Sequence, residues 1–149
     1  MLAIITVGCS ASGKSTWADK QKGFKVLSRD DFRRECAKVV YGDEIYKMNL
    51  WSVWKFNKET ENEITRQIRV MIQMYAHSNQ NIIIADTNLN KDRNRELEHF
   101  LTKLDYEVEY KYFPIGYDTA VERDEMRRDT VGHKVIAKQL DQYAKLRFE

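Results

Sequence analysis

Cysteine and proline are both scarce in this sequence of 149 residues. The two cysteines, Cys9 and Cys36, are too few for a disulfide framework, and no cluster of histidines accompanies them, which argues against a zinc site. The single proline and the six scattered glycines leave no stretch with the composition of a flexible linker, and no segment is repeated. We therefore expect one domain, residues 1–149, in a reducing compartment.

Long apolar runs and a strong net charge are missing as well. No run approaches the roughly 20 apolar residues that a membrane-spanning helix requires, and the N-terminus lacks the basic segment of a secretory signal. The 25 Lys and Arg residues nearly balance the 23 Asp and Glu residues, which gives a net charge of +2. These absences predict a cytoplasmic protein with no membrane partner, and they restrict any contact with nucleic acid to a local surface.

Segments typical of buried strands alternate with segments typical of amphipathic helices. Apolar runs at 2–7, 25–28 and 81–86 predict strands of a parallel sheet. At 106–112, apolar and charged side chains alternate, which indicates a strand near the edge of the sheet. Helices are expected to begin near Ser15 and Asp30 and to cover about 57–77, the region of 97–104, 117–127 and 135–147. This pattern predicts an α/β fold that binds its ligand at the carboxyl ends of the strands.

A glycine-rich segment after the first predicted strand carries the clearest functional signal. It has the Walker A pattern GxxxxGK[ST], in the residues Gly8, Cys9, Ser10, Ala11, Ser12, Gly13, Lys14 and Ser15. The backbone N–H groups of such a loop bind phosphate, Lys14 reaches the β and γ phosphates, and the Ser15 hydroxyl binds Mg²⁺. With Thr16 next to it, this loop predicts a site for ATP or another nucleoside triphosphate in a P-loop NTPase-type parallel sheet sandwiched by helices.

Asp30 follows the second predicted strand, at the same edge of the sheet, and is placed to accept a proton. Arg33 and Arg34 come three and four residues later on the same helical face, where a guanidinium beside a carboxylate can hold a hydroxyl and a neighbouring phosphate. The spacing fits equally well a helix start stabilised by Asp30 and Asp31, with the arginines in surface ion pairs. The residues alone leave both interpretations open.

Three motifs together resemble the kinase domain of phage polynucleotide kinase. They are the P-loop continued to Ala18, Ser28-Arg29-Asp30-Asp31-Phe32-Arg33, and Ala85-Asp86-Thr87-Asn88-Leu89-Asn90. Their order and separations extend the resemblance through nearly the whole chain. That family transfers the γ-phosphate of a nucleoside triphosphate to the 5'-hydroxyl ends of DNA or RNA.

The resemblance implies a role for each matching residue on the acceptor side. Asp30 corresponds to the general base, and Arg33 corresponds to the arginine that engages a phosphate of the acceptor strand. Asp86 orders the acceptor or the water shell of the metal ion, and Thr87 and Asn88 belong to the same acceptor motif. The nucleic-acid partner implied is therefore a 5'-hydroxyl end.

A basic segment late in the chain resembles the lid of that family, in which an arginine contacts the donor phosphates. Arg127 matches this arginine best because its spacing from Arg123, which the resemblance also assigns to the nucleotide, agrees. The segment 128–135 is longer than the family pattern, so Arg128 is an alternative, and a solvated helix end is another. The resemblance implies a basic helical lid, with Lys14, Asp30 and Arg127 as catalytic residues.

Two tryptophans precede the predicted helix at 57–77. Trp51 and Trp54 have side chains on which nucleic-acid bases stack, but burial beneath that helix is the stronger expectation from composition.

Two other functions are compatible with the P-loop alone. One is a small-molecule kinase with a sugar, nucleotide or antibiotic as acceptor, and the other is a non-catalytic module that uses nucleotide binding as a switch. Asp30 with Arg33, and the triplet at 86–88, favour the polynucleotide kinase over both. No DxDGT-like phosphatase motif is present, so we expect kinase activity without phosphatase activity. The choice of DNA or RNA and the oligomeric state, a homo-oligomer included, stay open.

Overall fold

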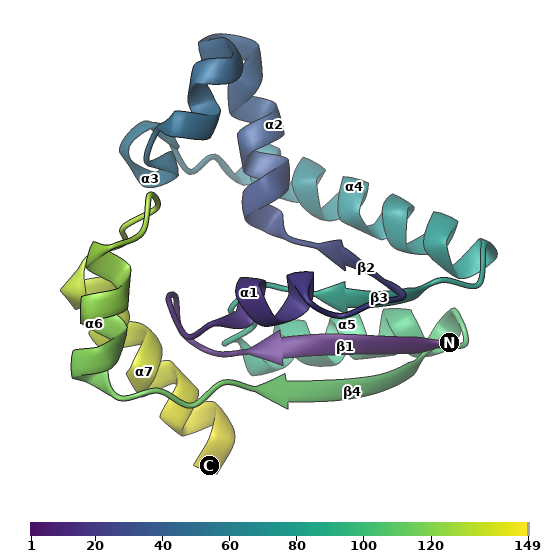
Figure 1. Ribbon diagram of the computed structural model, residues 1–149. Coiled ribbons are helices and arrows are strands. Elements are labelled where there is room, and N and C mark those ends of the chain that lie inside the picture. The colour runs from purple at the N-terminus through teal and green to yellow at the C-terminus, as the bar shows by residue number, and fades with distance from the viewer. Residues whose placement is uncertain (149) are drawn as a thin grey trace.

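Four parallel strands form the centre of the fold, in the order β2-β3-β1-β4 (Figure 1). The computed structural model describes residues 1–148. The strands are β1 (Leu2–Val7), β2 (Phe24–Leu27), β3 (Asn81–Ile84) and β4 (Glu107–Tyr112). The predicted parallel sheet is confirmed, and β1, which pairs on both sides, is buried along nearly its whole length because strands and helices surround it.

The helices follow the expected alternation with the strands. They are α1 (Lys14–Asp19), α2 (Arg29–Tyr41), the 3-10 helix η1 (Gly42–Lys47), α3 (Leu50–Val53), α4 (Lys58–His77), α5 (Lys91–Lys103), α6 (Tyr117–Glu125) and α7 (His133–Phe148). The bounds of α4 agree with the prediction to within one residue. In contrast, α6 ends two residues before the predicted end at 127, because the chain turns there around Asp124. Within residues 1–148, none of these helices combines the length and the apolar composition needed to cross a membrane.

The two faces of the sheet are covered unequally. Alternate side chains of β1 point to opposite faces, so Ala3 and Ile5 join a core cluster with α4 and α5, whereas Ile4 packs toward α1. The cluster on the α4 and α5 side includes Leu27, Ile64, Ile68, Ile72, Ile82, Ile84, Leu101 and Tyr106. Because α1 has only six residues, Phe24 and Val26 stay half-buried beneath it. The expected sandwich of helices is therefore present but thin on one side.

β4 lies at the edge of the sheet, as the alternating pattern predicted. Its outer residues Glu107, Glu109 and Lys111 are exposed, whereas the apolar residues between them are half-buried. An edge strand with charged side chains discourages pairing with a second sheet.

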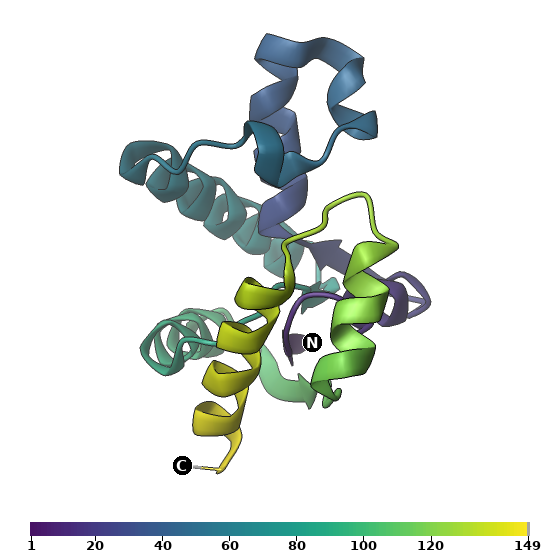
Figure 2. The same cartoon turned by 90° about the vertical axis from the view of Figure 1, so that its left-hand side faces the viewer.

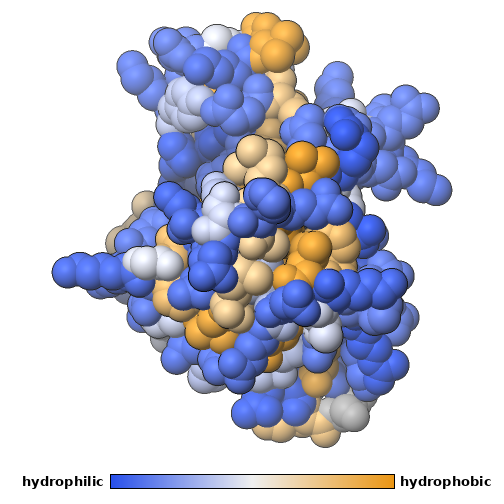
Figure 3. Space-filling view, turned by 90° about the vertical axis from the view of Figure 1, so that its right-hand side faces the viewer, coloured by the Kyte–Doolittle hydropathy of each residue, from blue (hydrophilic) through white to orange (hydrophobic). Residues whose placement is uncertain are grey.

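The loops that follow β1, β2 and β3 meet at the carboxyl ends of the strands. Two further parts of the chain approach these loops (Figures 1 and 2). One is α2 with η1 and α3, and the other is the pair α6 and α7. The amide of Asn49 donates to the Thr130 carbonyl at 3.2 Å, and the Leu50 N–H donates to Asp129 at 3.0 Å, so hydrogen bonds join the two parts. On the opposite side, where the strands begin, hydrophilic residues surround a central band of hydrophobic ones (Figure 3).

Candidate active site

The P-loop depends on glycine at two positions. The Gly8 N–H donates to the Thr87 carbonyl at 3.1 Å, and a Cβ at Gly8 would lie only 2.8 Å from the Ser12 hydroxyl and 2.9 Å from the Phe113 Cβ. Gly13 has a φ of +98°, a left-handed conformation that side chains disfavour, directly before α1 begins. Glycine therefore allows the close packing of the loop and its turn into the helix.

Lys14 is buried at the centre of this loop. Its ammonium donates to the Cys9 carbonyl at 2.5 Å and to the Ser12 hydroxyl at 3.3 Å. Burial is the main reason that the pKa of Lys14 falls to about 8, and the positive charge of Arg127 lowers it further. Cys9 itself is buried with a raised pKa, also through burial, so it acts as a packing residue rather than as a nucleophile. Anionic phosphates entering the loop would raise the pKa of Lys14 again and favour its charged form.

Two carboxylates from the next two strand ends lie close to this lysine. Asp30, with 46% of its side chain exposed, accepts a hydrogen bond from Arg33 at 2.8 Å. Asp86 accepts a hydrogen bond from the Arg29 N–H at 2.8 Å. Because protein surrounds the Asp86 carboxyl on most sides, burial raises its pKa to about 6, and the charge of Asp30 adds to this rise. The charges of Asp86 and Asp30 both act on Lys14, so the three predicted residues form one site.

Glu61 on α4 completes the acidic side of the site, and the sequence analysis missed it. Its carboxylate accepts from Arg33 at 2.6 Å, from Arg29 at 3.1 Å and from the indole N–H of Trp54 at 3.1 Å. Burial favours the neutral acid, but the bonds with the two arginines together hold the pKa of Glu61 below its usual value. Helical periodicity could have indicated this residue. Glu61 lies three residues before the buried Ile64, so it is on the inner side of α4.

Arg33 and Arg34 differ sharply in their surroundings although they are neighbours on α2. Arg34 is buried, donates to the carbonyls of Ile45 at 2.6 Å and Met48 at 3.4 Å, and forms an ion pair with Asp129. These contacts bind α2 to η1 and to the segment between α6 and α7. Arg33 alone faces Asp30, so the suggestion that both arginines serve one acceptor is not supported.

The triplet at 86–88 organises the loop after β3. The amide nitrogen of Asn88 donates to the carbonyls of Thr6 at 2.7 Å and Asp86 at 3.2 Å, and the Thr87 carbonyl accepts from Gly8. These bonds tie the loop to β1 and to the P-loop. Burial lowers the pKa of Lys14 and the charge of Asp86 acts to raise it, and a direct contact of Thr87 or Asn88 with a substrate stays a prediction.

Arg127 lies on the P-loop side of the segment that joins α6 and α7. It donates to the Asp124 carboxylate at 2.9 Å and to the Asp129 carbonyl at 2.9 Å. Its positive charge acts to lower the pKa of both Lys14 and Cys9. Its buried Nε atom has no hydrogen-bond partner within residues 1–148. Such a donor calls for a partner that the described part of the chain does not supply.

The other two arginines of this segment point elsewhere. Arg128 donates to the Tyr46 carbonyl, next to α2, and Arg123 is exposed on α6. The structure therefore favours Arg127 over Arg128 as the arginine nearest the P-loop.

Two polar residues that the sequence analysis missed fix the position of this segment. Asp124 is buried and accepts hydrogen bonds from the N–H groups of Val131 at 3.1 Å and Gly132 at 2.9 Å, besides Arg127. Burial opposes its charge, but these bonds together lower the pKa of Asp124. Gln139 on α7 accepts the N–H of Ser10 at 2.8 Å and so attaches α7 to the P-loop. Neither side chain stands out in the sequence.

The oxygen-bearing side chains at the P-loop fit a magnesium ion that is bound together with phosphates. Ser15 and Thr16 are exposed in the first turn of α1, and the charge of Asp86 acts in the same site. No group of three or more acidic, histidine or cysteine side chains within residues 1–148 could enclose a metal ion. Because Mg²⁺ commonly uses one or two protein ligands supplemented by phosphate and water, a site for it at Ser15 stays a prediction.

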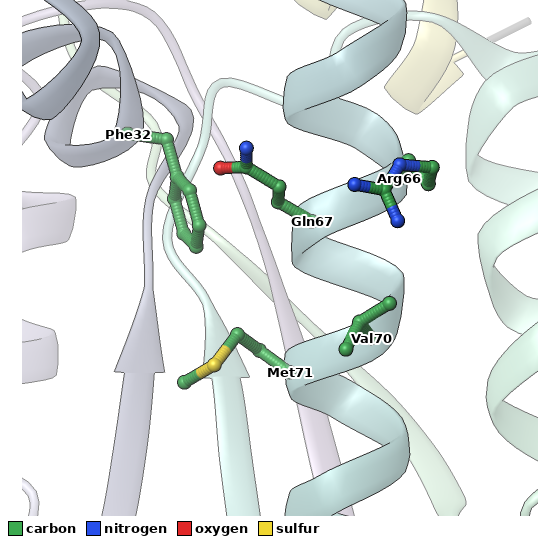
Figure 4. Close-up of a pocket in the computed structure, with 5 residues that line it drawn as sticks. All are labelled: Phe32, Arg66, Gln67, Val70 and Met71. Carbon is green, nitrogen blue, oxygen red and sulfur yellow. The ribbon is translucent and has the colours of Figure 1, made fainter.

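A separate pocket lies between α2 and α4 (Figure 4). It is lined by Phe32, Arg66, Gln67, Val70 and Met71, and its surface is almost entirely apolar. None of the candidate catalytic residues lines it.

Comparisons with known proteins identify the family of the chain. A family model described as an AAA domain matches residues 4–148. A protein of Autographa californica nuclear polyhedrosis virus, named as a bifunctional polynucleotide kinase/RNA ligase, is 26% identical over 147 residues, which are 96% of this chain and 21% of that protein. The chain therefore spans about a fifth of this relative.

Solved structures share the fold. A chain of the Pnkp1/Rnl/Hen1 RNA repair complex has a TM-score of 0.75 and 25% identity, covering 99% of this chain and 46% of that one. A gluconokinase from Sinorhizobium meliloti 1021 has a TM-score of 0.63 at 14% identity, with 99% and 78% coverage. The fold is that of P-loop kinases, and the gluconokinase shows that this fold also accommodates a small acceptor.

Proposed function

The chain belongs to the AAA domain family with a P-loop kinase fold, and on this premise we propose that it is a polynucleotide 5'-hydroxyl kinase. It transfers the γ-phosphate of ATP or another nucleoside triphosphate to the 5'-hydroxyl end of DNA or RNA, in nucleic-acid end repair in the cytoplasm. The observation that carries this proposal is the Asp30–Arg33 pair at 2.8 Å, in a site where the charge of Asp30 acts on Lys14. The names of the viral relative and of the RNA repair complex support it.

The donor half consists of the P-loop and the lid segment. Backbone N–H groups from Gly8 to Ser15 and the Lys14 ammonium bind the triphosphate, and Arg127 adds a second positive charge. Ser15 would hold Mg²⁺, which would neutralise part of the remaining phosphate charge. Arg123 is assigned a weaker, outer contact with the nucleotide because it is exposed.

The acceptor half consists of Asp30, Arg33 and Asp86. Phosphoryl transfer passes through a loose transition state, so the main tasks of the protein are to align the hydroxyl and to accept its proton late in the reaction. Asp30 is the more exposed of the two carboxylates and accepts that proton, whereas Asp86, with a pKa near 6, orders the acceptor or the water around the metal ion. Arg33 binds a phosphate of the acceptor strand, a group that a sugar or an antibiotic lacks.

A transfer assay tests this proposal. The protein is incubated with γ-labelled ATP, Mg²⁺ and a single-stranded oligonucleotide with a 5'-hydroxyl, in parallel with the same oligonucleotide carrying a 5'-phosphate and with a panel of sugars and nucleosides. We expect label on the 5'-hydroxyl oligonucleotide and none on the 5'-phosphorylated one. Label only on a small acceptor would replace the proposal with a small-molecule kinase, and binding of ATP with no transfer to any acceptor would favour a nucleotide-dependent switch.

Substitution of two neighbouring arginines should affect kcat to very different extents. Arg127→Ala is expected to reduce kcat by about 10³-fold, as removal of an arginine that stabilises a transferring phosphoryl group does. Arg128→Ala is the matched control, and it should change kcat by less than about threefold because its guanidinium bonds to the distant Tyr46 carbonyl. Melting temperatures of both variants check that the loss of the Arg127–Asp124 bond has not unfolded the segment. The reverse order of effects would identify Arg128 as the lid arginine.

A further inference from the structure

We propose that Trp51 and Phe56 form a subsite on which a base of the acceptor strand stacks, beside the phosphate that Arg33 binds. This inference rests on the proposed function. This subsite recognises a nucleobase through its flat face and so tolerates different base sequences.

The two rings form a nearly parallel pair on top of Arg33. Their planes differ by 7° and their centroids are 6.0 Å apart, and the Arg33 guanidinium carbon lies 5.4 Å from the Trp51 centroid and 5.5 Å from the Phe56 centroid. Phe56 is 70% exposed, whereas Trp51 is half-buried. A parallel pair at this separation is offset, and the exposed fraction of Phe56 leaves much of that ring in contact with solvent.

Core packing does not explain these rings. Neither Trp51 nor Phe56 belongs to the apolar core clusters found in residues 1–148, so the expected burial of Trp51 beneath α4 is not seen. Trp54 does follow that expectation, since it packs against the main cluster and donates its indole N–H to Glu61. The two tryptophans, three residues apart, therefore have different roles.

The subsite is held in place before any ligand arrives. Trp51 is in α3, whose first turn is capped by the Asn49 side chain at 2.9 Å and anchored by the fully buried Leu50. Arg33 is fixed by Glu61 and by Asp30. Preorganisation of this kind lowers the entropy that binding costs.

Arg33 keeps capacity for a phosphate in spite of these bonds. A guanidinium has five N–H groups, and three of them are used, one toward Asp30 and two toward Glu61, which leaves two. The side chains thus follow one another as a carboxylate for the hydroxyl, a guanidinium for the phosphate and aromatic rings for the base. A single-stranded nucleic acid presents these groups in the same succession, whereas a sugar or a protein surface does not.

An acceptor series with single abasic positions tests this subsite. With the wild-type protein, loss of the base at one of the first three positions from the 5' end should raise KM by about 5- to 150-fold, which corresponds to the roughly 1–3 kcal/mol measured for stacking of one base. Phe56→Ala should raise KM for the intact strand by a similar factor, and an abasic position should then raise KM no further. Phe56→Trp should restore the low KM for the intact strand and the sensitivity to the abasic position. Phe148→Ala is the control, because Phe148 is also exposed, by 79%, but lies at the end of α7.

Binding of a fluorescent oligonucleotide, measured by anisotropy with intact and abasic strands, gives a readout that does not depend on transfer. The subsite would be overturned if Phe56→Ala and Trp51→Ala still bound the abasic strand more weakly than the intact strand, by the same factor as the wild-type protein. The melting temperature of Phe56→Ala must be unchanged for this comparison. If the wild-type protein transfers no phosphate to 5'-hydroxyl ends, the proposed function fails, and the anisotropy series still decides whether the rings bind a base.

Discussion

Replacement of Asp30 by Ala is expected to reduce phosphate transfer by about 10²- to 10⁴-fold, the usual contribution of a general base, while the affinity for ATP changes by less than about twofold. Asp30 is nearly half exposed and its only hydrogen-bond partner within residues 1–148 is Arg33, so its removal leaves the P-loop contacts of Lys14 intact. Single-turnover transfer and calorimetric titration with ATP measure the two quantities separately.

Two further variants separate the chemical role of Asp30 from its contact with Arg33. Asp30→Asn keeps an oxygen that can accept the Arg33 hydrogen bond but cannot accept a proton at neutral pH, so it should be about as inactive as Asp30→Ala. Asp31→Ala, which removes the exposed acid next along the same turn, should retain transfer to within about threefold, as a substitution at a site without a specific role does. Parallel losses of ATP binding and transfer in Asp30→Ala would show instead that Asp30 belongs to the donor half.

The predicted residues that the structure brings together are those whose position follows from topology. Gly8 to Ser15, Asp30 and Asp86 each come directly after a strand of a parallel sheet, so their convergence at one edge is a consequence of strand direction. No side-chain contact has to be known for that argument.

Several of the residues that were missed are polar side chains whose partners lie far away in the sequence. Glu61 contacts Arg33 across 28 positions, and Asp129 contacts Arg34 across 95. Helical periodicity places Arg33 and Arg34 on the same side of α2, but it does not tell which of them faces Asp30 and which faces Asp129. Such differences depend on the crossing of α2 over α4 and on the fold of η1 and α3, which have no periodic signature.

The same reasoning accounts for the aromatic residues. Composition favours burial for any tryptophan, and it treats Trp51 and Trp54 alike. The short helix α3 turns Trp54 toward Glu61 and the core, whereas Trp51 reaches Arg33 and Phe56. The acceptor side of the site is therefore the part that needed the structure most, whereas the P-loop of the donor half was readable from one motif.

The charge of Lys14 should make nucleotide binding depend on pH in the range just above neutrality. Burial lowers the pKa of Lys14 from 10.5 to about 8, so the free protein loses the ammonium charge above pH 8, whereas bound phosphates favour the charged form. Binding above pH 8 must then take up a proton, and Kd for ATP should rise by up to about tenfold per pH unit. Because the lysine pKa is lower in the folded state than in the unfolded state, the same shift stabilises the free protein as pH rises from about 8 toward 10.5.

Calorimetric titrations with ATP at pH 7, 8, 9 and 10, in buffers of different ionisation enthalpy, measure both the change in Kd and the proton uptake. Lys14→Met should weaken ATP binding at pH 7 by about 10- to 150-fold, as loss of a charged hydrogen bond of roughly 1.5–3 kcal/mol does, and it should abolish transfer and the pH dependence together. Lys14→Arg is the matched control, because its guanidinium stays charged throughout this range, so its Kd should be flat with pH. A wild-type Kd that is constant from pH 7 to 10, or a slope that survives in Lys14→Met, would contradict the assignment of Lys14 as the buried ammonium that the donor phosphates recharge.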